Sequence, residues 1–556
     1  MVWAALPAAF ACSMGSGPDL AQDTGASGVR ITARVGGRPQ KPAGSEVVPS
    51  APELAIPLTC GDGVCGGERG ENFGNCPRDC QTLDHRADYF AALLASRSFA
   101  VDVGAFDIFE AEDCADVVRC FYNNPTSPYG IPLVPPGPGE PHPDPGNWLP
   151  RPPGMEHLNP VYRLRPDEAI VWIGTTPPEC PYFSFTNYVF IRTEPDSEGG
   201  PPFSGQTIVF ASLGESENQV TLRTSAHPGE SPFGRECVVI ATPDRGVDGV
   251  IRSALEDAGF PGSIVNTLPF PRFQADGITP KVRLGYDPEG DVLRLLMRIA
   301  HPDAPVEGTT IRAWLANTGS RVFRVRPMLD VPLDPFPLPP RRTPGTGESE
   351  EESSLLELVR RIQDAHAELP SETRVAFPSP MADGDFCLEN LTPCNGDCRD
   401  TPYMGAMFKL GDAPEAIIVA GRNHETSGKA AYVNVTATRV LGGIAFHSVV
   451  MRDLVSSADV YLPHHPDRNN LWQTKFSRDC RGEPFCYEVT EEHIATDEWL
   501  AVLVRAYLEP ATGTSAKTFP LRESELVFPR VIKVNCAEGC GPAPRRSSPA
   551  VAIPMP

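Results

Sequence analysis

Proline restricts the fold of this chain more than any other residue type. The sequence holds 62 prolines among its 556 residues, which is about twice the average usage. Proline fixes φ and removes a backbone donor, so it is poorly tolerated inside helices and central strands. The chain is also too long for one hydrophobic core. The composition therefore favours several units joined by extended segments, and it argues against a helical bundle.

Short strand-like patterns separated by turns fill most of the chain after Tyr162. Two of them are nearly the same, EAIVWIG at 168–174 and EAIIVAG at 415–421, and each precedes a turn and a strand that opens with tyrosine. Another strand is expected at 310–316. Helical periodicity predicts helices at 82–99, 105–121, 245–260 and 354–369. These patterns indicate an α+β, β-rich fold with two strand-rich lobes, and the repeated heptapeptide indicates that the lobes are related.

Composition divides the chain into seven segments. They are an export signal and flexible linker (1–55), a cysteine-rich module (56–81), a helical segment with a proline-rich strap (82–160), a first β-rich lobe (161–331), a Pro/Gly/Glu linker (332–353), a second β-rich lobe (354–535) and a disordered tail (536–556). The strap is expected to be extended and to lack donors for a sheet. The Pro/Gly/Glu linker has little to bury.

Sixteen cysteines, many at short spacings, point to an oxidising compartment. The cluster CLENLTPCNGDCRD at 387–400 holds three of them, so at least one is expected to pair elsewhere, with Cys180 and Cys237 as candidates. Cys114 and Cys120 are six residues apart, so an unbroken helix would hold them too far apart for a disulfide. We therefore expect an exported, disulfide-stapled protein on the outer surface, in the periplasm or outside the cell.

The first residues, MVWAALPAAFAC, are apolar and rich in small side chains. They resemble the lipobox of bacterial lipoproteins, and the resemblance implies lipidation of Cys12 after cleavage. The match departs from that pattern because no Lys or Arg precedes Arg30 and Phe10 lies where a small residue is usual. A lipid at Cys12 is the membrane contact that we expect, since no later run is long enough for a transmembrane helix.

The stretch CGDGVCGGERGENFGNCPRDC, at 60–80, packs four cysteines among several carboxylates. It resembles short cysteine-rich segments of secreted bacterial proteins of the myxobacterial type, and the resemblance implies export rather than an activity. Carboxylates on a disulfide frame could bind Ca²⁺, whereas solvated carboxylates on a frame held by disulfides alone are the alternative. The candidate metal residues are Asp62, Glu68, Glu71 and Asp79. The body of the chain resembles only uncharacterised secreted proteins.

Two loops of the second half carry the candidate catalytic residues. His424 and Glu425 follow one strand, and His464 and His465 lie in YLPHHPDRNN. If the loops met, two imidazoles and a carboxylate could bind a metal or act as base and acid. Locally hydrogen-bonded loop residues are the alternative.

A second enzymatic pattern is IVFASLGES, at 208–216. It resembles the GDS block of the SGNH hydrolases, which implies Ser216 as nucleophile. The Asp-x-x-His of that family is absent from this sequence, so the serine lacks its base.

The net charge of −23 argues against nucleic acid and anionic lipid as partners. Together these features favour an exported, surface-anchored protein that binds a protein or glycan, or has a structural role, and is not catalytic. The alternative is an extracytoplasmic hydrolase, metal-assisted or acid–base, that uses the region of His424 and His464.

Overall fold

The fold is α+β and rich in β-strands, as predicted. The computed structural model describes residues 65, 72, 74–77, 79–109, 124–143, 149, 151–193, 206–300, 310–345, 347–348, 352–367, 371–378, 383–412, 415–440, 443–496, 498–515 and 526–534. Within them the strands form four sheets, two in each half of the chain. The signal, the tail, Cys12 and the pair Cys114 and Cys120 lie outside the described residues.

The first half of the chain builds lobe 1 from two sheets. The outer sheet has the order β1 (Phe99–Val103), β11 (Arg321–Pro327), β4 (Ala169–Thr175), β8 (Glu236–Thr242) and β9 (Val265–Pro269). The inner sheet has the order β2 (Ala105–Phe109), β3 (Tyr129–Leu133), β10 (Val292–Ala300), β5 (Tyr182–Thr193) and β6 (Gln206–Ser212), with β7 (Glu217–Asn218) beside β5.

The second half builds lobe 2, also from two sheets. Its outer sheet has the order β12 (Ser371–Val375), β21 (Arg530–Val534), β15 (Ala416–Arg422), β18 (Leu471–Ser477) and β19 (Cys486–Glu488). Its inner sheet has the order β13 (Phe377–Pro378), β14 (Tyr403–Lys409), β20 (Trp499–Tyr507), β16 (Tyr432–Arg439) and β17 (Ile444–Val450).

The two lobes share one topology, strand for strand. In each outer sheet the first four strands are antiparallel neighbours and the last pair, β8 with β9 or β18 with β19, is parallel. Apart from the short β7, the strands of lobe 1 taken in chain order occupy the same places as the strands of lobe 2. The matching heptapeptides supply β4 and β15, which are equivalent strands. The lobes are therefore the same unit formed twice.

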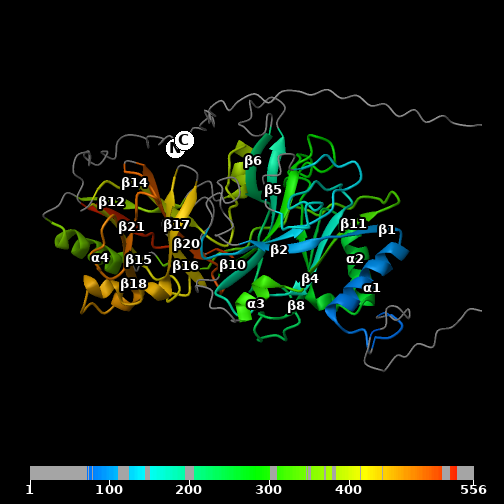
Figure 1. The fold of residues 1–556 in the computed structure, drawn as a ribbon, viewed down its shortest axis with the longest axis horizontal. Helices are drawn as coiled ribbons and strands as arrows, with labels where there is room; N and C mark the ends of the chain where they lie inside the picture. Colours follow the sequence, from blue (N-terminus) through cyan, green and yellow to red (C-terminus); the bar gives the residue numbers. More distant parts are fainter. Residues whose placement is uncertain are drawn as a thin grey trace, which may run out of the picture.

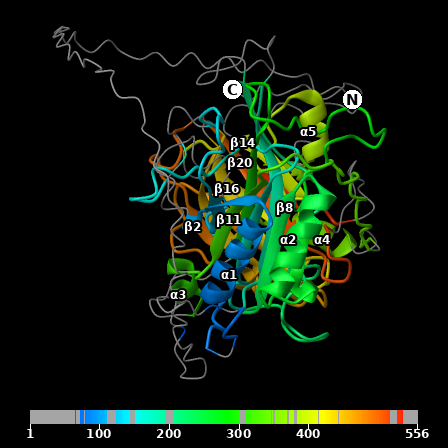
Figure 2. The same cartoon turned by 90° about the vertical axis from the view of Figure 1, so that its right-hand side faces the viewer.

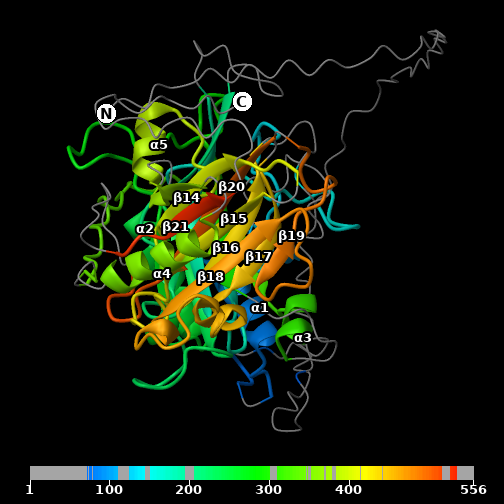
Figure 3. The ribbon, with the colours of Figure 1, turned by 90° about the vertical axis from the view of Figure 1, so that its left-hand side faces the viewer.

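The layers are stacked along the long axis of the molecule. Figure 1 shows α4 (Glu352–Ala365) at one end, then the outer and inner sheets of lobe 2, the inner and outer sheets of lobe 1, and α1 (Leu83–Ser96) and α2 (Arg245–Asp257) at the other end. Figure 2 shows α1 and α2 over β8 and β11, and Figure 3 shows α4 across β15, β18 and β21. Each lobe thus has one core between its sheets and a second core under its helices.

The helices begin where the sequence provides caps. Thr82 accepts a hydrogen bond from the backbone N–H of His85 at the start of α1, and Asp244 does the same for Val247 at the start of α2. The shorter helices are α3 (Thr310–Ala316), α5 (Gly384–Asn390), η3 (Gly262–Ile264), η6 (Met451–Leu454), η7 (Ser457–Val460) and η8 (Arg468–Asn470).

Several local predictions were wrong. Residues 105–109 form the strand β2 rather than a helix, because Phe106 and Ile108 contact the core between the sheets while Phe109 packs on the opposite face. Residues 310–316 form α3 rather than a strand, because Trp314 and Leu315 are buried at helical spacing from Ile311.

The segment 82–160, predicted as a helix and a proline-rich strap apart from the lobes, contributes α1 and β1–β3 to lobe 1. Part of the strap is therefore a sheet strand, contrary to prediction. Pro132 is tolerated in β3 because β3 pairs with β10 only at Tyr129 and Gly130.

The linker 332–353 is held by polar contacts along its described part, although it buries little apolar surface. Arg342 donates to the Ser216 carbonyl oxygen at 2.6 Å, and the Gly345 N–H donates to Glu509 at 2.7 Å. Farther along, the carboxylate of Glu348 lies against His424. Charge and hydrogen bonding therefore order this linker across both lobes.

Candidate functional site at the contact between the lobes

The inner sheets of the two lobes meet through equivalent tyrosines. Tyr182 opens β5 and Tyr432 opens β16, and their rings lie 4.8 and 5.6 Å from the ring of Tyr507. The Tyr182 hydroxyl donates to Asp400 of lobe 2 at 2.7 Å, and the Tyr432 hydroxyl lies 2.5 Å from the Thr126 hydroxyl of lobe 1. A loop of each lobe thus contacts the hydroxyl group of the tyrosine in the other lobe.

The two loops are equivalent as well. Asp400 lies three residues before Tyr403, and Thr126 lies three residues before Tyr129. Both tyrosines begin equivalent strands, and each stands beside an arginine of the central strand of its sheet. Arg298 lies 5.7 Å from the ring of Tyr129, and Arg505 lies 5.6 Å from the ring of Tyr403. The contact therefore has approximate two-fold symmetry.

Residues 383–400 of lobe 2 bind along β6, the edge strand of the inner sheet of lobe 1, and we call this segment the clamp. Its Cys394 and Gly396 N–H groups donate to the carbonyl oxygens of Val209 and Phe210 on β6, at 2.7 and 2.9 Å. Arg298 of lobe 1 donates in return to the Gly396 carbonyl oxygen. The clamp thus satisfies part of an otherwise open sheet edge.

Two aspartates of the clamp are completely buried. Asp397 accepts from the backbone N–H and the hydroxyl of Ser212, at 2.8 and 2.6 Å. Burial raises the pKa of Asp397 to about 6, although the bonds from Ser212 oppose it. Burial likewise raises the pKa of Asp400 to about 7, against the bond from Tyr182 and the charge of Arg342. One oxygen of Asp400, Oδ1, has no hydrogen-bond partner among the described residues.

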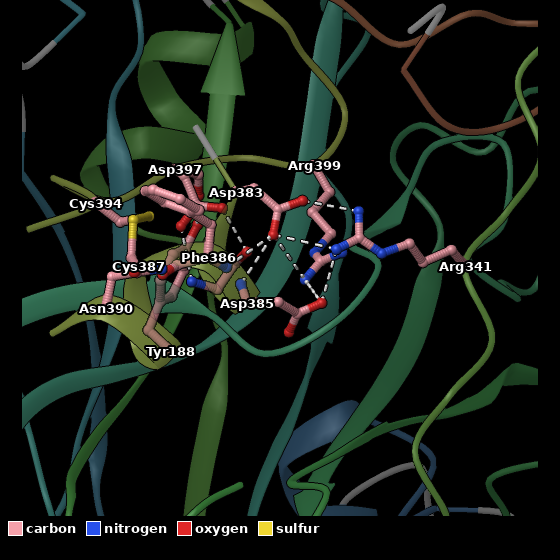
Figure 4. The surroundings of a disulfide bond; sticks show 11 residues. Tyr188, Arg341, Asp383, Asp385, Phe386, Cys387, Asn390, Cys394, Asp397 and Arg399 are labelled. Atoms are coloured by element: carbon pink, nitrogen blue, oxygen red, sulfur yellow. Dashed lines mark hydrogen bonds and ion pairs between the residues drawn. A yellow bond between two sulfur atoms is a disulfide. The ribbon is translucent and has the colours of Figure 1, made fainter. Parts of the chain in front are cut away.

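Opposite charges fix the start of the clamp (Figure 4). Asp383 caps α5 and pairs with Arg341 of the linker at 2.7 Å. Asp385 pairs with Arg341 and Arg399, each at 2.8 Å, and with Lys281 of lobe 1. Burial alone would raise the pKa of Asp385, but Arg399 and Lys281 hold it well below its usual range. This cluster ties the linker, the clamp and lobe 1 together.

The cysteines of the clamp pair differently from the expectation. Cys387 bonds to Cys394, and Cys398 remains a buried thiol rather than reaching Cys180 or Cys237, which are buried thiols too. The Cys398 sulfur lies 3.3 Å from the Tyr182 hydroxyl, and burial raises the pKa of its thiol to about 11. The thiol is therefore protonated and serves as packing. The other described disulfides join Cys65 with Cys80 and Cys480 with Cys486.

The histidine candidates divide between core and surface. His424 is completely buried with its Nδ1 2.5 Å from Glu348, and His464 is exposed. His465 accepts a hydrogen bond from the Asp467 N–H, and Glu425 accepts one from Val433 at 2.7 Å.

The loops that carry these candidates are adjacent, because the Asn423 N–H donates to the Asn470 carbonyl oxygen at 2.8 Å. His424 of lobe 2 and Glu348 of the linker form a buried pair. Burial would raise the pKa of Glu348, but His424 lowers it to about 2. The use of this region for catalysis stays a prediction.

The remaining candidates are placed only in part. Asp62, Glu68 and Glu71 lie outside the described residues, whereas Asp79 lies in the turn that ends at Cys80. Ser216 is completely buried and accepts a hydrogen bond from Thr186 at 2.8 Å. The face of β5 that carries Tyr182, Ser184, Thr186, Tyr188 and Phe190 is buried, so it belongs to the core.

Sequence reasoning missed the residues that join the lobes, above all Asp397, Asp400 and Arg298. A signal was present, because SPY at 127–129 and TPY at 401–403 precede equivalent strands. RVFRV at 321–325 and RVIKV at 530–534 form a further matching pair.

No protein-family model and no curated protein matches this sequence. Among solved structures, an uncharacterised protein from Burkholderia cenocepacia is 12% identical, with 81% of this chain and 86% of that chain covered and a TM-score of 0.33. The VPA0106 protein from Vibrio parahaemolyticus is 10% identical, with 68% of this chain and 88% of that chain covered and a TM-score of 0.31. The described part of the chain contains no helix long and apolar enough to span a membrane.

Proposed function

We propose that this chain is an exported, non-catalytic surface protein that presents its two lobes as one rigid body to a protein or glycan partner. The observation that carries the proposal is the use of the polar residues at the lobe contact. Tyr182, Tyr432, Asp397, Asp400 and Arg298 are all directed at the opposite lobe, and their hydrogen bonds hold the lobes together. Such residues serve assembly rather than the binding of a substrate.

Disulfides support the proposed location. Three are present among the described residues, and one of them staples the clamp at the lobe contact. Disulfides of this kind are typical of an oxidising, extracytoplasmic environment. Anchoring through a lipid at Cys12 is part of the proposal, as is Ca²⁺ bound by Asp62, Glu68, Glu71 and Asp79.

Location and anchoring can be tested in one experiment. The full chain is expressed in a Gram-negative host with its own N-terminus, cells are fractionated, and radiolabelled palmitate is followed in the wild type and in Cys12→Ala. We expect the wild type in the membrane fraction with label, and the variant without label in the soluble extracytoplasmic fraction. Wild-type protein that stays in the cytoplasm with reduced thiols would reject export.

The non-catalytic role needs a separate test. Purified protein is assayed on ester, phosphate, peptide and glycoside substrates, and on glycan and cell-surface protein arrays, beside His424→Ala. We expect array binding that the variant retains, and no turnover. Turnover that His424→Ala abolishes, while folding is unchanged by circular dichroism, would favour the hydrolase alternative. Metal analysis with and without chelator tests Ca²⁺.

A further inference from the structure

Within the described residues, one buried arginine of lobe 1 has no ion-pair partner. Arg294, on β10, is 4% exposed, and its Nε has no hydrogen-bond partner in the part of the chain that the structure describes. No carboxylate in the described part of the chain forms an ion pair with it. Other arginines of the inner sheet are satisfied, since Arg192 pairs with Asp291 at 2.7 Å and Arg298 donates to the Tyr188 hydroxyl and the Gly396 carbonyl.

Three aromatic rings surround the guanidinium. Its central carbon lies 5.4 Å from the ring centre of Phe190 and 5.8 Å from those of Phe109 and Phe210. Phenylalanine faces attract a cation by about 0.5–2 kcal/mol. The desolvation of an unpaired ion costs several kcal/mol, so the rings compensate only part of it. Burial accordingly lowers the pKa of Arg294 to about 10.

The second lobe shows that the fold does not need this arginine. Arg294 faces Tyr188 in the register of β10 and β5, and the equivalent pair in lobe 2 is Ala501 and Thr438. Position 190 likewise corresponds to Val440, two residues after Thr438. Lobe 2 therefore builds the same sheet without this arginine and without an aromatic ring at the place of Phe190, whereas the arginine at position 298 is kept in lobe 2 as Arg505. Arg294 is an addition to the common unit.

We infer that Arg294 is the anchor of a binding site for a small carboxylate ligand on the inner sheet of lobe 1. A guanidinium group matches a carboxylate in planar geometry and can bind it through two hydrogen bonds. The phenylalanine rings offer contact to an apolar part of the ligand. Inorganic phosphate is also an oxyanion but has no apolar part. Binding measurements can therefore distinguish phosphate from a carboxylate ligand that carries an apolar group. The inference does not depend on the proposed function.

The test uses the full chain and three probes, acetate, benzoate and phosphate, at fixed pH and with ionic strength matched by chloride. Thermal unfolding and isothermal titration are measured for the wild type, for Arg294→Met and for the exposed control Arg481→Met. A ligand that binds only the folded state raises Tm in proportion to its saturation. We expect benzoate to raise Tm most, Arg294→Met to weaken its binding at least tenfold, and Arg481→Met to bind like the wild type.

Arg294→Met also removes an unpaired buried charge and keeps most of the side-chain volume. We therefore expect it to be at least as stable as the wild type in chloride alone. A probe effect that is the same in the wild type and in Arg294→Met would overturn the inference, as would the absence of any probe effect. Preference for phosphate over both carboxylates would overturn the assigned ligand class. A strongly destabilised Arg294→Met with no anion dependence in the wild type would show that a carboxylate of the chain itself pairs with the arginine.

Discussion

Arg324 on β11 lies with its Nη2 3.2 Å from Oε2 of Glu168, the residue before β4, and neither side chain is exposed. Lobe 2 has an ion pair at the same place, in which Nζ of Lys533 on β21 lies 3.0 Å from Oε2 of Glu415. The register makes the pairs equivalent, because Arg324 faces Ile170 and Lys533 faces Ile417. The duplicated unit thus includes a specific ion pair as well as a strand order.

Replacement of Arg324 by methionine should destabilise lobe 1 strongly. The change leaves the carboxylates of Glu168 and Glu140 buried without their cation, since Arg324 also pairs with Glu140 at 2.6 Å. We expect a loss of about 3–5 kcal/mol in the free energy of unfolding, measured in urea by circular dichroism. Lys533→Met should cost less, because its pair is partly exposed. The exposed Arg361→Met should cost under about 1 kcal/mol, and equal losses in the three variants would contradict the assignment.

The buried aspartates of the clamp should make the protein more stable in mild acid. The pKa of Asp400 is raised to about 7 in the folded state, from an ordinary value of 3.8. Between those values the folded state holds a proton that the unfolded state lacks, so stability falls as pH rises from about 4 to about 7. Asp397, with a pKa of about 6, acts in the same direction over a narrower range.

Asp400→Asn tests this pH dependence directly. The amide cannot ionise but can still accept the bond from Tyr182, so we expect a flatter pH profile and a gain on the order of a few kcal/mol at pH 8. Asp364→Asn, at an exposed position, is the control, and its stability should depend on pH as that of the wild type does. The hypothesis fails if Asp400→Asn is less stable at pH 8 while its profile keeps the wild-type slope.

Much of the fold was predictable because it follows local periodicity. The helical periodicity of α1 and α2 and the matching heptapeptides of β4 and β15 are visible in sequence alone. The contact between the lobes was not predictable, because the residues that form it lie far apart in the chain and the loops that supply them have no periodic pattern. Arg298 donates to Gly396, 98 residues away, and Tyr182 donates to Asp400, 218 residues away. Such pairs depend on how two finished sheets dock.

The disulfide of the clamp should stabilise the lobe contact as well as its own loop. Cys387 and Cys394 are seven residues apart in the sequence. Replacement of both by serine should lower the free energy of unfolding by about 2–3 kcal/mol. Serine at Cys480 and Cys486, which are six residues apart in lobe 2, should cost a similar amount. Hydrogen exchange separates the two, because only loss of the first disulfide should speed exchange along β6. Faster exchange at β6 in both variants would contradict this role.

The close approach of the clamp to β6 should make Gly384 intolerant of a side chain. A methyl group there would overlap the carbonyl oxygen and the amide nitrogen of Ser212, and backbone atoms of a paired strand cannot move aside cheaply. Gly384→Ala should therefore lower the free energy of unfolding by about 1–3 kcal/mol, although alanine has a higher helix propensity than glycine. The matched control is Gly249→Ala in α2, where nothing lies within 4 Å of the added carbon and a gain of about 0.5–1 kcal/mol is expected. If Gly384→Ala were as stable as Gly249→Ala in urea, the clamp would not be held against β6 as the structure places it.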